Sequence, residues 1–442
     1  MNIEFIVVLS EATPSQFSPP RSISHLSRSD PLGGKTQLRQ HNKNIIAIYF
    51  SQPNIFIVFG IYFHWPYCLS KCIYCDFGTT ILSADINQQN YAENCKKQLE
   101  YFSGKIGQTE PITSIYFGGG TPSILEASII AELVDYVKST FDVTVDCEIT
   151  LEANPTSFEI NKFEKFNQAG VNRLSLGVQS MDDDELRFLG RKHTVAQAIV
   201  AINEIKHIFP RWTFDLIYGL PKQTQTKWLD ELAQALALCS QHMSLYTLIV
   251  DENTLLGQMV ARKIVVPKTE EELADFYDAT NEFIRQNSNL EHYEVSNYAV
   301  SGQESRHNLA YWNSNDYIGI GAGAHGRLRY ANGWRYELQG IFNTKQWHEN
   351  IANGGSGLEV ERALTEYEQA EEILIMGLRT KFGIDMDDMQ RRFGFDLMKY
   401  LDASKLAEFA EQKLVIYDNQ KLKLTYQGVK VLDMIVTQLN ID

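Results

Sequence analysis

The sequence predicts an α/β fold: an open, partial parallel βα barrel of about six strands, followed by a small helical C-terminal domain. Two observations support this prediction. Short apolar strand patterns alternate with amphipathic helix patterns between residues 59 and 286, and the chain becomes helical again from about residue 362. Strands that are separated by helical crossovers pair in parallel, so the alternation favours a parallel sheet or an open barrel.

The expected strands and helices follow one another in strict order. Strands are expected at 59–64, 113–117, 147–152, 172–178, 212–217 and 243–249, and helices at 85–103, 122–139, 157–168, 194–207, 224–238 and 269–286. In folds of this kind, ligands bind at the carboxyl ends of the strands. A functional motif should therefore fall directly after a strand.

The chain divides into four expected regions. Residues 1–54 carry scattered Ser, Pro, Gln and Asn with little periodicity, which predicts a mostly disordered extension. Residues 55–290 form the expected barrel core, and residues 291–361, rich in Gly, Asn, Tyr and Trp, are expected to complete it with strands and loops. Residues 362–442 are expected to form the C-terminal domain, with helices at 370–380, 385–393 and 397–411 and a strand pair near 414–425.

Charge and hydropathy exclude several classes of protein. The chain has 40 Lys+Arg against 55 Asp+Glu, a net charge of -15, so it lacks a general basic surface for nucleic acid. No apolar run approaches the roughly 18 residues that span a membrane, and the best run, 55–63, predicts a buried strand instead. Residues 1–10 lack the basic region of a secretory signal. These features predict a cytoplasmic protein without a transmembrane segment.

Three of the six cysteines, Cys68, Cys72 and Cys75, lie together directly after the first expected strand. Their soft thiolates suit an iron–sulfur cluster or zinc in a reducing compartment. Structural zinc needs four ligands, and His64 is a possible fourth, but Pro66 stiffens the chain between His64 and the first cysteine. The spacing favours a cluster with one open iron that chelates a small molecule. The remaining cysteines fall in helix or strand patterns and are expected in the core: Cys95, Cys147 and Cys239.

The cysteine segment resembles a known signature. Its C-x3-C-x2-C spacing, with Tyr74 before the third cysteine, is similar to that of the radical S-adenosylmethionine superfamily. The flanking words Tyr62-Phe-His-Trp-Pro, Asp76-Phe77 and Phe117-Gly-Gly-Gly-Thr-Pro-Ser123 resemble the oxygen-independent coproporphyrinogen III oxidase-like family, most closely its HemW heme chaperone branch. The resemblance runs from about residue 58 to the C-terminus. It implies a [4Fe-4S] cluster on the three cysteines and S-adenosylmethionine at the open iron.

The resemblance also implies which residues bind S-adenosylmethionine. They are Tyr62, Tyr74, Gly118, Gly119, Gly120, Thr121, Glu152, Gln179, Arg191 and Asp215. Most of them follow strands, as the fold rule requires. Glycines let the backbone approach a ligand closely, and the carboxylate of Glu152 can accept ribose hydroxyls or the amino group. One or two molecules of S-adenosylmethionine are both compatible with these residues.

Several of these residues have a purely structural alternative. The glycine triplet can be a tight turn, with Thr121 as the N-cap and Pro122 at the first position of a helix. Glu152 can be a simple strand-end carboxylate. Asp215 lies in an expected buried strand, where a carboxylate needs a partner, so an ion pair with an arginine is the alternative to a ligand.

Two features favour the chaperone branch over the oxidase. The oxidase carries a further cysteine two residues after the third ligand, where this chain has Phe77. The word His307-Asn308-Leu-Ala-Tyr311-Trp312 resembles the element linked to heme binding in the chaperones. It implies His307 as an iron ligand and stacking of Tyr311 and Trp312 on the porphyrin. The alternative is a core aromatic pair with a satisfied histidine, and His325 is a weaker candidate ligand.

The sequence therefore leaves three functions open. The favoured one is a heme chaperone that transfers heme to an acceptor protein and receives electrons from a donor such as flavodoxin or ferredoxin. The second is a radical oxidase, for which the resemblance implies decarboxylation of porphyrinogen propionates through a 5′-deoxyadenosyl radical. The third is a binding protein whose fold is stabilised by a structural zinc ion. Whether the chain is an enzyme is not decided by its sequence.

Overall fold

The computed structural model describes residues 58–82, 86–107, 110–239, 241–418 and 420–440. The extension expected over residues 1–54 lies outside them. The strands are β1 (Phe59–Trp65), β2 (Tyr67–Cys68), β3 (Thr80–Ile81), β4 (Ile112–Gly119), β5 (Val143–Ala153), β6 (Arg173–Gln179), β7 (Arg211–Tyr218), β8 (His242–Thr247), β9 (Glu291–Glu294), β10 (Asn297–Ala299), β11 (Tyr317–Ile320), β12 (His325–Arg329), β13 (Arg335–Gly340), β14 (Leu358–Ala363), β15 (Ile384–Asp385), β16 (Val415–Tyr417) and β17 (Lys421–Leu424).

Most of these strands form one open sheet, which confirms the expected fold class. The sheet has twelve strands in the order β14-β13-β12-β11-β1-β4-β5-β6-β7-β8-β10-β9. Strands β1, β4, β5, β6, β7 and β8 are the six expected ones, and they are parallel. The sheet is larger than predicted because β11 adds a parallel strand beside β1 and both edges continue antiparallel.

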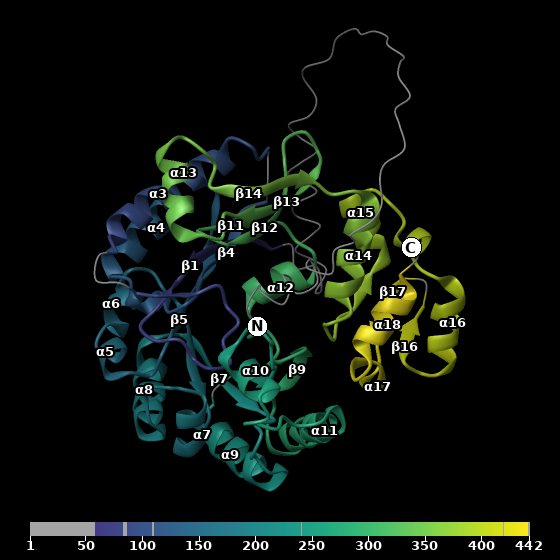
Figure 1. The fold of residues 1–442 in the computed structure, drawn as a ribbon. Coiled ribbons are helices and arrows are strands. Elements are labelled where there is room, and N and C mark those ends of the chain that lie inside the picture. The colour runs from purple at the N-terminus through teal and green to yellow at the C-terminus, as the bar shows by residue number, and fades with distance from the viewer. Residues whose placement is uncertain (1–57, 83–85, 108–109, 240, 419, 441–442) are drawn as a thin grey trace. The chain divides into compact units, whose positions relative to one another are not determined.

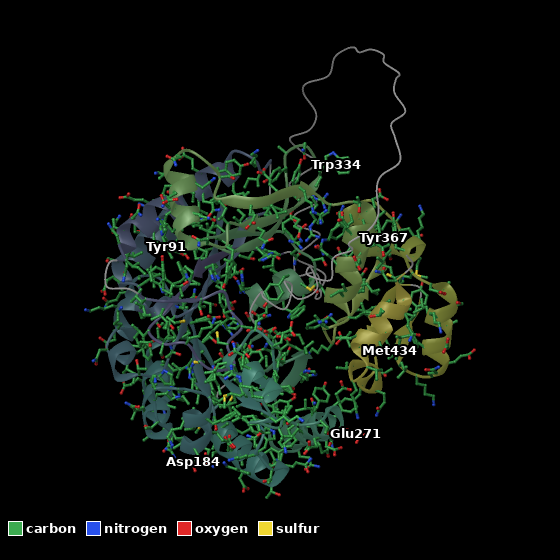
Figure 2. All side chains as sticks on the ribbon, viewed as in Figure 1. Tyr91, Asp184, Glu271, Trp334, Tyr367 and Met434 are labelled. Carbon is green, nitrogen blue, oxygen red and sulfur yellow. The ribbon has the colours of Figure 1, made fainter. Side chains whose placement is uncertain are left out.

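The helices of the described residues are α3 (Gln88–Ser103), α4 (Ala127–Thr140), α5 (Ser157–Ile160), α6 (Phe163–Gln168), α7 (Asp183–Phe188), α8 (Val195–Ile208), α9 (Gln225–Leu238), α10 (Leu255–Ala261), α11 (Glu270–Asn287), α12 (Arg306–Trp312), α13 (Thr344–Ala352), α14 (Glu366–Gly377), α15 (Met386–Phe393), α16 (Ala403–Glu411), α17 (Tyr426–Val429) and α18 (Leu432–Leu439). Helices α3, α4, α8 and α9 lie on the outer side of the sheet, whereas α12 lies on its inner side (Figure 1). Figure 2 marks Tyr91 on α3, whose hydroxyl donates to the carbonyl oxygen of His64 at 2.8 Å and so fixes α3 against β1.

Several predicted boundaries were wrong for local reasons. The helix expected at 122–139 begins as a 3₁₀ turn (Pro122–Ile124) before α4, and the one at 157–168 divides into α5 and α6. The helix expected at 397–411 divides because the Asp402 side chain caps a new helix at the backbone N–H of Ser404 and Lys405. The segment 291–361 was expected to hold strands and loops, yet residues 306–312 form α12 and residues 344–352 form α13.

The chain end has its own hydrophobic cluster, formed by residues between Ala370 and Leu439. It begins at a capping box in which Thr365 and Glu368 exchange hydrogen bonds. Glu372 on α14 forms ion pairs with Arg327 and Arg335 of the sheet. The separate C-terminal domain remains a prediction, since residues 58–442 group as one compact unit. In the part of the chain that the structure describes, no helix has the length and apolar character needed to cross a membrane.

Candidate functional site

The two faces of the parallel sheet differ in chemistry because side chains alternate along each strand. One face is apolar and packs on the outer helices through residues such as Ile61, Phe117, Leu151, Leu174 and Phe214. The opposite face carries their polar and aromatic neighbours in sequence: Tyr62, His64, Ser114, Tyr116, Glu148, Glu152, Arg173, Ser175, Thr213 and Asp215. Helix α12 packs on this inner face through His307, whose Nδ1 lies 3.2 Å from Ser114 Oγ. The inner face is therefore the candidate site.

The cysteine loop begins where β1 ends and is closed by its own small sheet. Strand β2 pairs in parallel with β3, placing Cys68 opposite Ile81. The backbone of Ile73 donates to Leu189 O at 3.4 Å and accepts from Leu256 N at 2.8 Å, which holds the middle of the loop. All three cysteines, Cys68, Cys72 and Cys75, are partly buried, and they form no disulfide among the described residues. The loop is thus fixed at both ends and in the middle.

Side chains of the described residues donate hydrogen bonds to the cysteine sulfurs, and Thr79 and Thr121 both donate to Cys68. Thr121 Oγ1 lies 3.6 Å from Cys68 Sγ, and Arg191 Nη1 lies 3.5 Å from Cys72 Sγ. Burial raises the pKa of Cys68, a shift that the Thr121 hydrogen bond opposes. Donors of this kind stabilise a thiolate, the form that binds metal. The donor set therefore fits a thiolate-bound cluster.

The arrangement does not form the zinc site considered from the sequence. Within the described ranges, no three His, Cys, Asp or Glu side chains converge closely enough to hold one ion. His64 faces its own strand neighbour, with Nδ1 3.1 Å from the Tyr62 hydroxyl oxygen. A four-iron cluster binds its thiolates through different iron atoms, so its ligands are spread more widely than those of a single ion.

The glycine triplet lies directly against the cysteine loop. Gly120 N donates to Trp65 O at 2.7 Å, and Thr121 N donates to Tyr67 O at 2.9 Å. A Cβ on Gly120 would lie 2.5 Å from Tyr67 O and 3.0 Å from Cys68 Sγ, so no larger residue fits. The triplet is required by this close approach of two backbones.

Thr121 stands at the N-cap position of a 3₁₀ turn, as the structural alternative expected. Its side chain makes no cap hydrogen bond to the 3₁₀ turn, although Pro122 does stand at the first position. Thr121 Oγ1 instead donates to Cys68 Sγ at 3.6 Å and lies 3.4 Å from the amide nitrogen of Asn154. The side chain thus belongs to the cysteine site rather than to the helix.

Glu152 lies on the inner face of β5 beside the triplet. It accepts from the Tyr116 hydroxyl at 2.8 Å and from Gly119 N at 3.2 Å. Burial raises the pKa of Glu152 to about 7 despite these hydrogen bonds. A carboxylate of this kind is close to half ionised at neutral pH and would be stabilised by a cationic ligand.

Gln179 and Arg191 come together around Gly177. Arg191 Nη2 donates to Gly177 O at 2.7 Å and to Asn154 Oδ1 at 2.5 Å, while its Nε has no hydrogen-bond partner. A Cβ on Gly177 would lie 3.0 Å from Gln179 Nε2. Gln179 has a φ of 76°, which glutamine rarely adopts, at an irregularity in the pairing of β6 with β7. Tyr74 interacts electrostatically with Arg191, which ties it to the same group.

Asp215 faces the same interior from β7. It accepts from Ser175 Oγ at 3.4 Å and also from Ser244. Burial raises the pKa of Asp215. Among the described residues it forms no ion pair with an arginine, but the positive charge of Arg173 acts to lower its pKa. The hydrogen bonds to its carboxylate come from the hydroxyl groups of Ser175 and Ser244.

His307 stands on α12, whose N-terminus is held by a buried carboxylate. Glu148 Oε1 accepts from Arg306 N at 2.9 Å and from His307 N at 3.4 Å. The imidazole stacks on Tyr116 at 4.8 Å between ring centroids and on Tyr62 at 6.0 Å. Burial, with a smaller contribution from Arg173, lowers the pKa of His307 to about 3. The ring is therefore neutral, and its Nε2 has no hydrogen-bond partner among the residues that the structure describes.

The other residues of the motif at 307–312 are buried along the same helix. Asn308 Oδ1 accepts from Ser305 Oγ at 3.1 Å, and the Tyr311 ring meets His307 edge-on at 6.0 Å. Trp312 packs edge-on against Tyr311 at 5.2 Å, and its Nε1 is buried without a hydrogen-bond partner. The word thus forms one aromatic cluster on the inner face.

His325 lies on β12 at the other side of β1. It is 4% exposed, and burial lowers its pKa to about 4, with smaller contributions from Arg327 and His64. Its Nδ1 is buried without a hydrogen-bond partner. His325 is therefore also a neutral imidazole, and it interacts electrostatically with His64 of β1.

Sequence reasoning missed six residues of the inner face: Ser114, Tyr116, Glu148, Arg173, Ser175 and Thr213. Tyr116 lies in an apolar stretch of the sequence, which predicts a residue of the hydrophobic core. The detectable signal was the charge of Glu148 and Arg173, because a charged residue in an otherwise buried strand needs a partner. None of these residues follows the end of a strand, where functional motifs were sought. The missed residues lie deeper on the strands than the predicted ones.

Comparison with known proteins places the chain in a family. The Radical SAM superfamily model matches residues 62–235, and the HemN C-terminal domain model matches residues 364–431. The chain is 34% identical to the mitochondrial Radical S-adenosyl methionine domain-containing protein 1 of Bos taurus over 86% of this chain and 87% of that protein. It is 32% identical to the heme chaperone HemW of Lactococcus lactis over 84% of this chain and 94% of that one.

The fold is shared with a solved structure. Coproporphyrinogen III oxidase (HemN) from Escherichia coli, a radical SAM enzyme, superimposes with a TM-score of 0.72 over 87% of this chain and 90% of that chain, at 21% identity. The superfamily implies a [4Fe-4S] cluster and S-adenosylmethionine, and the cysteine loop has the donor set for the cluster. The chain belongs to the radical S-adenosylmethionine superfamily and, within its coproporphyrinogen III oxidase-like family, to the branch of the heme chaperone HemW.

Proposed function

We propose that this chain is a heme chaperone, which binds heme and passes it to an acceptor protein. The observation that carries the proposal is its similarity to HemW of Lactococcus lactis, which spans 94% of that protein. The departure from the oxidase at Phe77 supports the same branch. The chaperone keeps a radical-type site, in which Cys68, Cys72 and Cys75 hold the cluster.

S-adenosylmethionine would bind beside the cluster among the residues that line the inner face. The open backbone of Gly118–Gly120 and the carboxylate of Glu152 would bind its amino and ribose groups, and Asp215 offers a second carboxylate. Gln179 and Arg191 would position the other end. A reduced cluster with this ligand supplies one-electron chemistry, while the protein side chains orient the ligand and exclude water.

Heme would be ligated by His307. A neutral imidazole with a partner-free nitrogen is the form that binds iron, and burial keeps His307 neutral at physiological pH. Its Nδ1 contact with Ser114, at 3.2 Å, orients the ring. Tyr311 and Trp312 would contact the porphyrin, and Asn308 would hold the helix start through Ser305.

The proposed partners are a heme acceptor protein and an electron donor such as flavodoxin or ferredoxin. The proposed location is the cytoplasm, where thiols stay reduced. Several relatives have mitochondrial in their names.

The test is a heme titration of the anaerobically reconstituted protein, followed through the Soret band. We expect stoichiometric binding by the natural protein, loss of most of the affinity in His307→Ala, and little change in His325→Ala. The matched control is His348→Ala, because His348 pairs with Asn94 at 2.7 Å on the outer side. Absent heme binding, or turnover of coproporphyrinogen by the reduced protein, would overturn the proposal. Unchanged heme binding by His307→Ala would leave the proposed chaperone function standing but would exclude His307 as the iron ligand.

A further inference from the structure

Arg173 is a buried cation on the inner face of the sheet. It opens β6, and its neighbour Leu174 faces the outer core, so alternation directs Arg173 inward. The residue is 3% exposed. It contributes electrostatically to the pKa values of Tyr116, Asp215 and His307, which places its charge among the side chains of the candidate site.

The guanidinium of Arg173 is poorly paired. Among the described residues its one ion-pair contact is Nε to Glu148 Oε2 at 4.0 Å, which is too long for a hydrogen bond. Glu148 is already engaged, because Oε1 accepts from two backbone N–H groups of α12 and Oε2 binds Arg211. Glu148 therefore cannot offer Arg173 the two-oxygen contact that arginine favours.

The neighbouring Arg211 gives a comparison, because its guanidinium is fully hydrogen-bonded. Its Nε donates to Gln303 Oε1 at 3.2 Å, its Nη2 donates to Glu304 O at 2.8 Å, and its Nη1 binds Glu148. All three of its nitrogens have partners. The two arginines stand opposite each other in the β6–β7 register, yet the side chain of Arg173 forms no hydrogen bond among the described residues.

A buried guanidinium with free donors is costly unless a ligand satisfies it. The matching ligand group is a carboxylate, which accepts two parallel hydrogen bonds from arginine. The walls beside Arg173 are aromatic: Tyr116 stacks on His307 at 4.8 Å. A cation next to flat aromatic side chains suits a planar ligand that carries carboxylates at its edge.

We propose that Arg173 binds a propionate carboxylate of the tetrapyrrole ligand inside the barrel. This inference rests on the proposed function, because it takes the ligand to be a tetrapyrrole. It assigns the anion contact to β6 and the iron contact to α12, so that the two edges of the macrocycle are held by different elements. Arg173 acts as a binding and positioning residue, with no part in electron transfer.

The test compares heme with heme dimethyl ester, which lacks both carboxylates. The full chain with its reconstituted cluster is titrated with each compound, as the natural protein and as Arg173→Gln, Arg173→Lys and Arg379→Gln. Arg379 is the control, since its side chain is also largely buried, 8% exposed against 4% for Arg173, but pairs with Asp433 at 3.1 Å in the C-terminal segment. Visible absorption of the cluster reports whether each variant is folded.

We expect the natural protein to bind heme roughly tenfold to a hundredfold more tightly than the ester, the range for a hydrogen bond to a charged group. Arg173→Gln should lose this preference while its affinity for the ester stays the same. Arg173→Lys should keep part of the preference, and Arg379→Gln should keep all of it.

Equal affinity of the natural protein for heme and ester would overturn the inference without any variant, and the proposed function would stand. If Arg173→Gln keeps the full preference for heme over the ester, the inference is also overturned and the proposed function also stands. If the natural protein binds neither compound, the proposed function and this inference both fail. If Arg173→Gln does not fold, the comparison of the two compounds on the natural protein decides the question alone.

Discussion

The two faces of the central sheet are built from the same strands and yet serve different purposes. On β4, Phe117 faces outward and stacks on Phe63 at 4.7 Å between ring centroids, whereas its neighbour Tyr116 faces inward and donates to Glu152 at 2.8 Å. The outer face is apolar and closed by helices. The inner face holds ionisable groups with shifted pKa values, and it adjoins the cysteine loop.

The difference shows how stability and function are divided in this fold. Apolar burial on the outer face drives folding. The inner face keeps buried polar groups, such as Arg191 Nε, His307 Nε2 and Trp312 Nε1, that have no hydrogen-bond partner. Such groups destabilise the protein alone and are typical of sites that bind ligands. Substitutions on the two faces should therefore separate stability from binding.

The largest expected effect comes from the cysteines. Cys72→Ala should abolish the cluster, because one of only three thiolate ligands is lost. The outer-face control is Cys95→Ala, a fully buried cysteine of the core, which should keep the cluster and lose about 1–2 kcal/mol of stability. Iron and sulfide content after anaerobic reconstitution measures the cluster, and denaturant unfolding measures the stability. Equal iron content in the two variants would contradict the assignment of the loop.

The neighbouring pair on β4 gives the second comparison. Phe117→Ala should lower the free energy of unfolding by about 3–5 kcal/mol, because it leaves a cavity in the outer core. Tyr116→Phe should cost only about 1 kcal/mol, but it should weaken binding of S-adenosylmethionine by releasing Glu152. Denaturant unfolding and equilibrium dialysis measure the two effects. A large stability loss in Tyr116→Phe with unchanged binding would contradict the division between faces.

The smallest effect is a pH dependence at Glu152. Because burial raises its pKa to about 7, the ionised carboxylate that binds the ligand is lost as pH falls below that value. We expect binding of S-adenosylmethionine to weaken by up to about tenfold per pH unit below 7. Glu152→Gln should bind weakly at every pH.

The free energy of unfolding should change with pH in the direction opposite to the binding of S-adenosylmethionine. The folded-state pKa of Glu152 lies above its ordinary value of 4.5, so its stabilising contribution is present at low pH and is lost as pH rises through about 7. Without ligand, Glu152→Gln should therefore unfold at a higher temperature than the natural protein at pH 8, with a smaller difference at pH 6. A pH-independent affinity in the natural protein would rule out this role for the carboxylate.

The sequence was sufficient for the parallel centre of the sheet, because each strand there alternates between an apolar outer face and a polar inner face over a full strand length. It was not sufficient for α12, since residues 306–312 are nearly all buried and show no amphipathic period. The antiparallel edges were missed because β10 and β12 are short and glycine or polar residues interrupt them.

For the site, motifs placed after strands led to the cysteine loop, the glycine triplet and Glu152, which lie in contact. The left-handed backbone of Gln179 and the Thr121 contact to Cys68 depend on tertiary packing, which local patterns do not encode. The environment of Arg173 depends on which oxygens of Glu148 are already occupied, and this is settled only by the position of α12.

The most direct test of the central claim uses one anaerobically reconstituted, reduced sample for two parallel measurements: heme titration and turnover of coproporphyrinogen. The account predicts a stable Soret band at one heme per chain and no decarboxylated product. Decarboxylated product from a sample that binds no heme would contradict it.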